Sequence, residues 1–286
     1  MAAEGLTECV VCRGTALEPR VHRVLSRCRE CGHVFYGDPP GAAPSELYDE
    51  RYFAEAEYRD YKSQRRTFAR NFDRYLRMMA RHGASGGRLL EIGAAYGFFL
   101  AEARGAFVVE GIDVSAAGAA WGREHLGLPL HCGDFLAFEP AAPYDVVCLW
   151  DTVEHLSRPD RFLARARDLL VPGGRLFLTT GDIGSVMARL RGARWRMIHP
   201  PTHLHYFSRP TIRRLLERLG FAVTGIQAVG TYRALGNIFH GLSLFAHQPW
   251  LRSLSRRLAN GAGRGWGRAH LYLNLFDVMF VGAQRV

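Results

Sequence analysis

Lysine is almost absent from this chain of 286 residues: Lys62 is the single lysine, so arginine supplies nearly all of the positive charge. The formal net charge of +10 is typical of chains that bind nucleic acid or membrane surfaces. The arginines are dispersed, however, and their densest groups lie at 189–196 and 252–268. We therefore expect an ordinary solvated basic surface, with attraction to an anionic substrate or a membrane surface as the alternative.

Long apolar runs are also missing. No run approaches the length of about 18 residues that a membrane-spanning helix needs, and no apolar stretch follows a basic patch near residue 1. These absences argue against a transmembrane helix and a signal peptide, and we expect a cytoplasmic protein. The hydrophobic content of 48% and charged content of 22% suit a globular chain with a sizeable core.

Residues 88–115 read RLLEIGAAYGFFLAEARGAFVVEGIDVS and predict a strand, a glycine-rich turn, a helix and a second strand. The turn spans 91–97, and Asp113 closes the second strand about 20 residues later. Small residues in such a turn let the backbone approach a nucleoside, and the carboxylate can accept hydrogen bonds from ribose hydroxyls. A pyrophosphate would be poorly placed beside Glu91, whereas an ammonium or sulfonium group would be favoured there.

The turn resembles motif I of the class I S-adenosylmethionine (SAM) dependent methyltransferases, (D/E)xGxGxG, with Ala95 in place of the middle glycine. Further stretches resemble the family's adenine loop (132–135), fourth strand (144–150) and turn into the fifth strand (170–176), in the family's order.

This resemblance implies an α/β fold, a Rossmann-like seven-stranded doubly wound sheet, with SAM as the cofactor. A nicotinamide enzyme or a ligand-free α/β domain is the alternative. The residues that the resemblance assigns to SAM are Glu91, Gly93, Ala95, Gly97, Asp113, Asp134, Phe135 and Trp150.

Four of the six cysteines have the spacing C-x2-C-x15-C-x2-C. Each pair can form a tight turn that offers two thiolates, and two pairs complete a tetrahedral zinc site. We therefore predict a structural zinc in a ribbon module over residues 1–41. The predicted ligands are Cys9, Cys12, Cys28 and Cys31. Disulfides are the alternative, disfavoured by a cytoplasmic location, and His22 or His33 could replace a cysteine as ligand.

After this module, residues 45–83 carry aromatic side chains at roughly helical spacing. They predict cap helices that pack on the sheet or line the acceptor site. The SAM-binding domain is expected to span 84–286. Cys132 and Cys148 are expected to pack as small apolar side chains in its core.

Strands and helices alternate from 88 to 181 in the pattern of a parallel sheet. A helix is predicted over 209–219, with Ser208 as its N-cap. Further strands are predicted at 221–229 and 271–284, the last of them antiparallel.

Residues 231–270 are predicted to form an insertion between the last two strands. We expect a lid or a packing segment there, and an interfacial membrane helix is the alternative.

Methyl transfer to oxygen or nitrogen requires removal of a proton from the acceptor. The base is expected after the fourth or fifth strand, because ligands of open parallel sheets bind at the carboxyl ends of the strands. The fifth strand is followed by Trp195, a candidate apolar wall, and by the histidine-rich stretch 199–207. The candidate bases are His155, His203 and His205. Each histidine could instead be structural, and Asp151 and Glu154 could hold the cofactor or a divalent cation.

These features together predict a SAM-dependent methyltransferase with an N-terminal zinc ribbon. The pair formed by Glu154 and His155 resembles that of methyltransferases that act on quinone precursors. We expect an oxygen, or else a carbon, of a small molecule or sugar to be methylated.

Two other functions stay open. One is an RNA methyltransferase whose ribbon and arginines bind phosphates, although the chain lacks the Asn/Asp-Pro-Pro-Tyr tetrapeptide common in enzymes that methylate base amino groups. The other is a non-catalytic SAM-binding scaffold whose zinc module recruits partners. The oligomeric state does not follow from the sequence.

Overall fold

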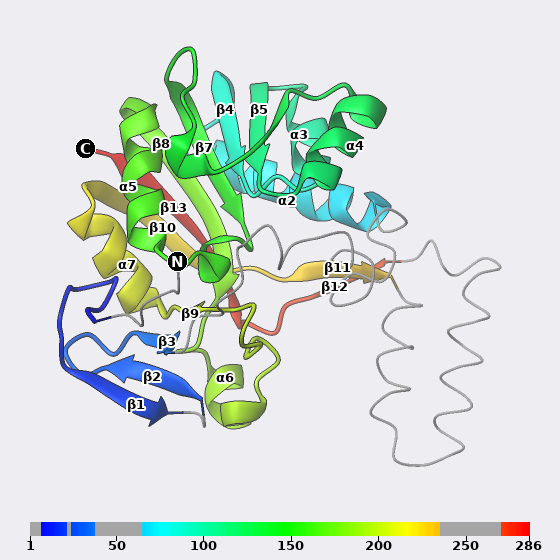
Figure 1. Ribbon diagram of the computed structural model, residues 1–286. Helices are drawn as coiled ribbons and strands as arrows, with labels where there is room; N and C mark the ends of the chain where they lie inside the picture. Colours follow the sequence, from blue (N-terminus) through cyan, green and yellow to red (C-terminus); the bar gives the residue numbers. More distant parts are fainter. Residues whose placement is uncertain (1–6, 22–23, 38–64, 235–269) are drawn as a thin grey trace, which may run out of the picture.

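A seven-stranded sheet forms the centre of the computed structural model, which describes residues 7–21, 24–37, 65–234 and 270–286 (Figure 1). In chain order its strands are β4 (Arg88–Ile92), β5 (Val108–Asp113), β6 (Leu130–Cys132), β7 (Tyr144–Trp150), β8 (Leu170–Gly181), β10 (Phe221–Ala228) and β13 (Val278–Arg285). Their order across the sheet is β10-β13-β8-β7-β4-β5-β6. The neighbouring strands from β6 to β8 pair in parallel, and β13 pairs antiparallel with both β8 and β10. The predicted doubly wound sheet is confirmed.

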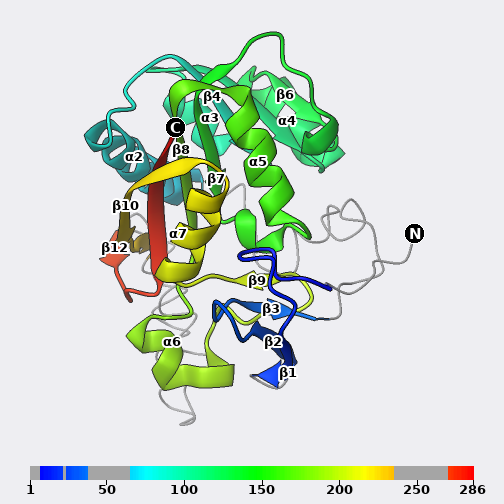
Figure 2. The same ribbon diagram turned by 90° about the vertical axis from the view of Figure 1, so that its left-hand side faces the viewer.

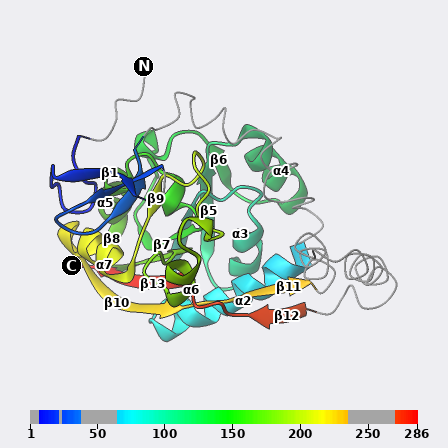
Figure 3. The same ribbon diagram turned by 90° about the horizontal axis from the view of Figure 1, so that it is seen from below.

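Helices cover both faces of this sheet (Figure 3). One face carries α2 (Arg65–Arg81), α3 (Phe98–Ala103) and α4 (Ala116–Leu126), and the other carries α5 (Pro159–Leu169) and α7 (Arg209–Arg218). The side chains of β7 alternate between these faces, since Cys148 packs with the first group of helices while Val147 and Leu149 pack with the second. Apolar side chains on both sides of the strand explain why β7 reads as a continuous apolar run.

The last predicted strand, 271–284, is wrong in extent, because the structure divides it in two. Its first part is β12 (His270–Leu273), which pairs with β11 (Thr231–Ala234) in a separate two-stranded sheet. Its second part is β13. Between them Phe276 adopts a φ of 57°, and its N–H donates to Asn274 Oδ1 over 2.9 Å. At this turn the pairing of β12 with β11 ends, and the pairing of β13 with β8 follows.

The N-terminal cysteine module is joined to the large domain through a second sheet. Its strands β1 (Leu17–Val21), β2 (Leu25–Cys28) and β3 (Val34–Tyr36) are followed by β9 (His205–Tyr206), which comes from the segment after β8 (Figure 2). In the β3–β9 pair, Phe35 lies opposite His205. The module is therefore completed by a strand from the larger domain.

Helix α7 holds the first cysteine turn from the other side. The guanidinium group of Arg218 donates hydrogen bonds to the carbonyl oxygens of Val10 (2.6 Å) and Val11 (2.8 Å). Both valine side chains are buried in the cluster that contains Leu215 and Leu216 of α7. The predicted start of α7 is also observed, since the backbone N–H of Ser208 donates to Thr211 Oγ1.

Parts of two predicted segments lie outside the described residues. Of the predicted cap region 45–83, the structure describes α2, whose Tyr75 packs against Trp150 with ring centroids 4.8 Å apart. Most of the insertion 231–270 is likewise not described. Within the described ranges, no helix has both the length and the apolar character needed to cross a membrane.

Candidate functional site

The glycine-rich turn after β4 has the backbone conformation that its motif requires. Gly93 and Gly97 have φ values of 78° and 76°. A Cβ atom at Gly93 would lie 2.6 Å from Thr152 Oγ1, so a larger residue would collide. Ala95 adopts a φ of 47°, at a cost of about 1 kcal/mol relative to glycine. The turn therefore keeps its shape although alanine replaces the middle glycine.

Asp113, at the end of β5, holds this turn closed. Its Oδ2 accepts a hydrogen bond from the Ala95 N–H (2.7 Å) and its Oδ1 accepts one from the Ser115 N–H (2.8 Å). Burial raises the pKa of Asp113, and these hydrogen bonds offset part of the rise. Each carboxylate oxygen has a second lone pair, so the side chain can also accept hydrogen bonds from a ribose.

Glu91 is a buried carboxyl group on β4 beside the turn. Its Oε2 has no hydrogen-bond partner among the described residues, and the side chain is 4% exposed. Burial, followed by the negative charge of Asp113, raises the pKa of Glu91 well above its usual value. A buried acid of this kind is stabilised by a nearby cation. The residues present therefore fit a ligand that combines a ribose with an ammonium and a sulfonium group, as SAM does.

Three further residues are assigned to SAM: Asp134 and Phe135, predicted to contact adenine, follow β6, and Trp150 ends β7. Asp134 accepts a hydrogen bond from the Leu136 N–H (2.9 Å) at the start of η2 (Phe135–Ala137). Phe135 is buried against Phe162, with ring centroids 5.6 Å apart. Trp150 lies in the core between α2 and α3. Contact of these three side chains with a cofactor stays a prediction.

Two of the three candidate bases meet after β7 and β8. His155 ends η3 (Val153–His155), and its ring centroid lies 4.6 Å from that of His203. The Nδ1 of His155 is 2.9 Å from the Thr202 carbonyl oxygen, and the Nδ1 of His203 is 2.8 Å from that of Met197. Because a carbonyl only accepts, each Nδ1 carries the proton and each Nε2 the lone pair.

Burial keeps both rings in the neutral form. It lowers the pKa of His155 to about 4 and the pKa of His203 to about 3, assisted by the neighbouring histidines. At neutral pH both rings can therefore accept a proton, although a low pKa makes each a weaker base.

The same rings have a carboxylate beside them. Potential ligand atoms of Glu154, His155 and His203 all lie within 4.8 Å of one another. Two imidazoles and a carboxylate are ligands that suit several divalent cations. This cluster could hold such an ion. Asp151 lies nearby in sequence, and its Oδ1 accepts a hydrogen bond from Thr179 Oγ1 over 2.8 Å.

The third candidate base, His205, lies at the ribbon. Its Nδ1 is 3.0 Å from His33 Nε2, and its Nε2 is 3.4 Å from the Ser157 carbonyl oxygen. His205 thus contacts the ribbon through His33 and does not belong to the His155–His203 pair. Its catalytic role stays a prediction. No local sequence signal marks the contact, since the two histidines are 172 positions apart.

The four N-terminal cysteines converge as their spacing predicts. Cys9 Sγ lies 3.6 Å from Cys31 Sγ, and Cys12 Sγ lies 3.5 Å from Cys28 Sγ. All four sulfur atoms lie within 4.8 Å of one another. A tetrahedral zinc with Zn–S bonds of about 2.3 Å requires sulfurs about 3.8 Å apart, so this cluster fits the metal. All four thiols are free of disulfides.

The other two cysteines differ from each other. Cys148 is buried in the middle of β7, as predicted. The prediction of a core position for Cys132 is wrong, because this residue is exposed. It ends β6, the edge strand of the sheet, whose last two residues, His131 and Cys132, are both exposed.

Comparisons with known proteins match this chain to methyltransferases. A family model described as a methyltransferase domain matches residues 61–225. The ubiquinone biosynthesis O-methyltransferase of Acinetobacter baumannii (strain AYE) is 33% identical over 45% of this chain and 60% of its own length. The protein of the same description from Caulobacter sp. (strain K31) is 35% identical over 32% of this chain and 40% of its own. The chain thus spans less than two thirds of the curated relatives it matches.

Solved structures share the fold at low sequence identity. A SAM-dependent methyltransferase of Thermotoga maritima superposes with a TM-score of 0.51 at 15% identity, covering 82% of this chain and 99% of its own. The magnesium protoporphyrin IX methyltransferase of Synechocystis PCC 6803, solved with bound SAH, gives 0.50 at 14% identity, covering 82% and 92%. The common feature is the fold.

The predicted zinc site can be tested by replacing one of its four cysteines. Cys28→Ser should lose most of the bound zinc and destabilise the protein by about 3 kcal/mol, because metal binding is coupled to folding of the module. The melting temperature should fall by about 6 °C or more. Metal analysis and calorimetry would measure both effects. Cys132→Ser, which removes an exposed thiol, is the control; full zinc content in Cys28→Ser would rule out a four-cysteine site.

Proposed function

Because the chain belongs to the methyltransferase domain family, whose model matches residues 61–225, we propose that it transfers the methyl group of SAM to an oxygen of a small molecule. The class I SAM-dependent methyltransferase domain that the motifs predicted is thereby confirmed. The oxygen acceptor is supported by the relatives named as O-methyltransferases of ubiquinone biosynthesis. The observation that carries the proposal is the carboxyl edge of the sheet, where Glu91 and Asp113 border the glycine-rich turn.

The cofactor-binding residues would contact different parts of SAM. Asp113 would accept hydrogen bonds from the ribose while its backbone contacts hold the turn, and Glu91 would face the cationic end. Gly93 and Gly97 allow the turn its positive φ values and its close packing against Thr152 and Leu128. SAM, when bound there, supplies an electrophilic methyl group on a sulfonium.

His155 is the base that the geometry favours for deprotonating the acceptor. It follows β7, at the edge where the ligands of parallel sheets bind. Its Nδ1–H is fixed by the Thr202 carbonyl, so its Nε2 is the proton acceptor. His203, which has the same tautomer, is the second candidate.

The zinc site belongs to this proposal as a structural element. Four sulfur ligands leave no coordination position for a substrate, so the metal would fold the ribbon and take no part in methyl transfer. The ribbon is paired through β9 to the segment that carries His203. Zinc would therefore act on the site through that segment.

The proposed activity can be tested with methyl-labelled SAM and two acceptor pools, a small-molecule extract of the source cell and its total RNA. We expect label in the small-molecule pool, whose labelled mass would identify the acceptor. Label in RNA would overturn the small-molecule assignment and make the ribbon and arginines a phosphate-binding surface. SAM binding without transfer to either pool would favour the scaffold alternative.

Asp113→Ala should weaken SAM binding more than about tenfold, because the ribose loses its acceptor and the turn loses the hydrogen bond from the Ala95 N–H. Calorimetric titration with SAM would measure the effect. Glu110→Gln, on the same strand but bonded to Arg88 and Tyr144, is the matched control and should bind SAM normally. Unchanged affinity in Asp113→Ala would contradict the assignment.

The candidate bases respond differently to substitution. His155→Gln should lower kcat about 100-fold with little change in SAM affinity, because the proton acceptor is lost. If His155 is the base, wild-type kcat should fall as pH drops through about 4, where the ring takes up a proton.

His205→Leu serves as the comparison for this test. It should instead destabilise the protein by about 1–3 kcal/mol, because His33 Nε2 would be left buried without its partner. A larger kcat loss in His205→Leu than in His155→Gln, measured on folded protein, would reverse the assignment.

A further inference from the structure

A cavity of about 440 Å³ lies between the ribbon and the segment that follows β8. The ribbon contributes Arg27 and Val34 to its lining. The opposite side comes from the loop after β8, from α6 (Val186–Arg191) and from the turn that follows, including Ala188 and Trp195. Its volume lies within the range of about 300–1,000 Å³ typical of small-molecule sites. None of the residues assigned above to SAM binding and none of the candidate bases lines it.

The floor of the cavity is apolar and held in place. Val34 and Trp195 are 2% and 3% exposed and belong to one buried cluster with Ala188. Trp195 is fixed because its Nε1–H donates to Asp277 Oδ2 over 3.0 Å. Such a floor suits the apolar part of a ligand.

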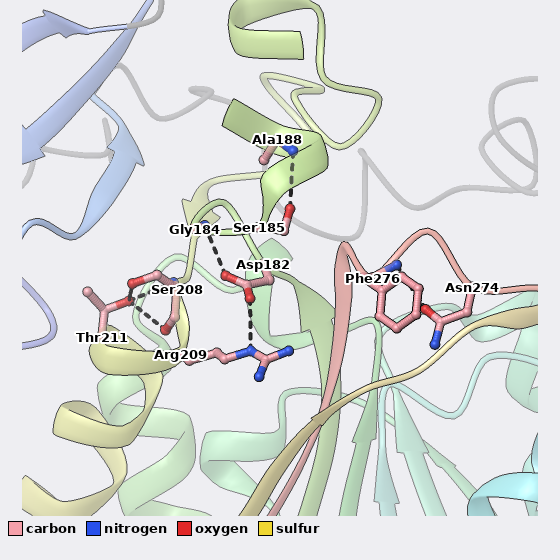
Figure 4. Close-up of polar contacts among 9 residues, drawn as sticks. All are labelled: Asp182, Gly184, Ser185, Ala188, Ser208, Arg209, Thr211, Asn274 and Phe276. Carbon is pink, nitrogen blue, oxygen red and sulfur yellow. Dashed lines mark hydrogen bonds and ion pairs between the residues drawn. The ribbon is translucent and has the colours of Figure 1, made fainter. Parts of the chain in front are cut away.

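Charge at the cavity is positive. Arg27 and Arg189 both line it, and within the described ranges neither side chain forms a hydrogen bond or an ion pair. No acidic residue is among the described residues of the lining. Asp182, two residues from the lining residue Gly184, is already bound by Arg209 (3.1 Å) and by the Gly184 N–H (2.9 Å), as Figure 4 shows. These contacts compensate the negative charge of Asp182, so it does little to reduce the positive potential in the cavity.

We propose that this cavity binds a small amphipathic anion, a molecule with an apolar body and one carboxylate, sulfonate or phosphate group. The apolar body would lie on Val34, Ala188 and Trp195, and the anionic group would be bound by Arg27 and Arg189. Arginine suits this role because its planar group donates paired hydrogen bonds to such oxyanions. Since the two arginines come from the ribbon and from α6, the ligand would bridge the two modules.

The site can be probed with 8-anilinonaphthalene-1-sulfonate, an aromatic sulfonate, and with N-phenyl-1-naphthylamine, the same aromatic body without the charge. Fluorescence titrations would use the full-length, zinc-loaded protein with saturating SAH, so that the cofactor site is filled. The readout is dye binding and does not depend on methyl transfer. Its failure is therefore distinguishable from failure of the proposed function.

The double variant Arg27→Gln/Arg189→Gln should bind the sulfonate about tenfold more weakly, because hydrogen bonds to the charged group are lost. Its affinity for the neutral dye should stay within about twofold. The matched control is Arg29→Gln/Arg191→Gln, which removes two charges from the same two modules outside the lining. It should bind both dyes as the wild type does.

A second variant tests the cavity by filling it. Ala188→Leu should weaken the binding of both dyes, since Ala188 is part of the floor, and its melting curve would show that the protein is folded. Unchanged sulfonate affinity in the Arg27/Arg189 double variant would overturn the proposal. So would an equal loss in the control double variant, which would indicate general charge attraction. Sulfonate binding that occurs only in a parallel titration without SAH would also overturn it, because the dye would then occupy the cofactor site.

Discussion

The pairing of β3 with β9 is the constraint on which the arrangement of the candidate site depends. The Tyr36 N–H donates to the Leu204 carbonyl (2.7 Å), and the Leu204 N–H in turn donates to the Glu154 carbonyl (2.8 Å). These two bonds tie the ribbon, the histidine-rich segment and the residue after β7 into one continuous backbone network. His203 immediately precedes Leu204, so its meeting with His155 depends on a strand supplied by the ribbon.

The ribbon is consequently part of the domain core and not a flexible appendage. Val10 and Val11 are almost fully buried beside α7, and burial of side chains of this size stabilises by about 1.5–3 kcal/mol each. Arg218 adds two hydrogen bonds to carbonyls of the same turn. Folding of the cysteine turns therefore also positions the segment after β8. A metal bound in the ribbon would affect the candidate site in this way although it lies outside that site.

Sequence reasoning succeeded where the determining contacts are local. The turn 91–97 follows from glycine positions within a few residues, and the fourth strand was predicted with the bounds observed, 144–150. It failed where sheet order decides: the exposure of Cys132 depends on β6 being an edge strand. Sequence reasoning also could not place His205. This residue meets His33 across 172 positions, and no periodicity encodes that contact.

The preference for arginine over lysine has a structural basis in this fold. Arg218 bonds two successive carbonyls, and Arg196 binds both carboxylate oxygens of Asp277. A lysine ammonium lacks the planar fork that makes such paired bonds. These two arginines therefore hold parts of the fold together with paired hydrogen bonds. Arg27 and Arg189 differ from these arginines in that both line one cavity, where their charge is available to a ligand.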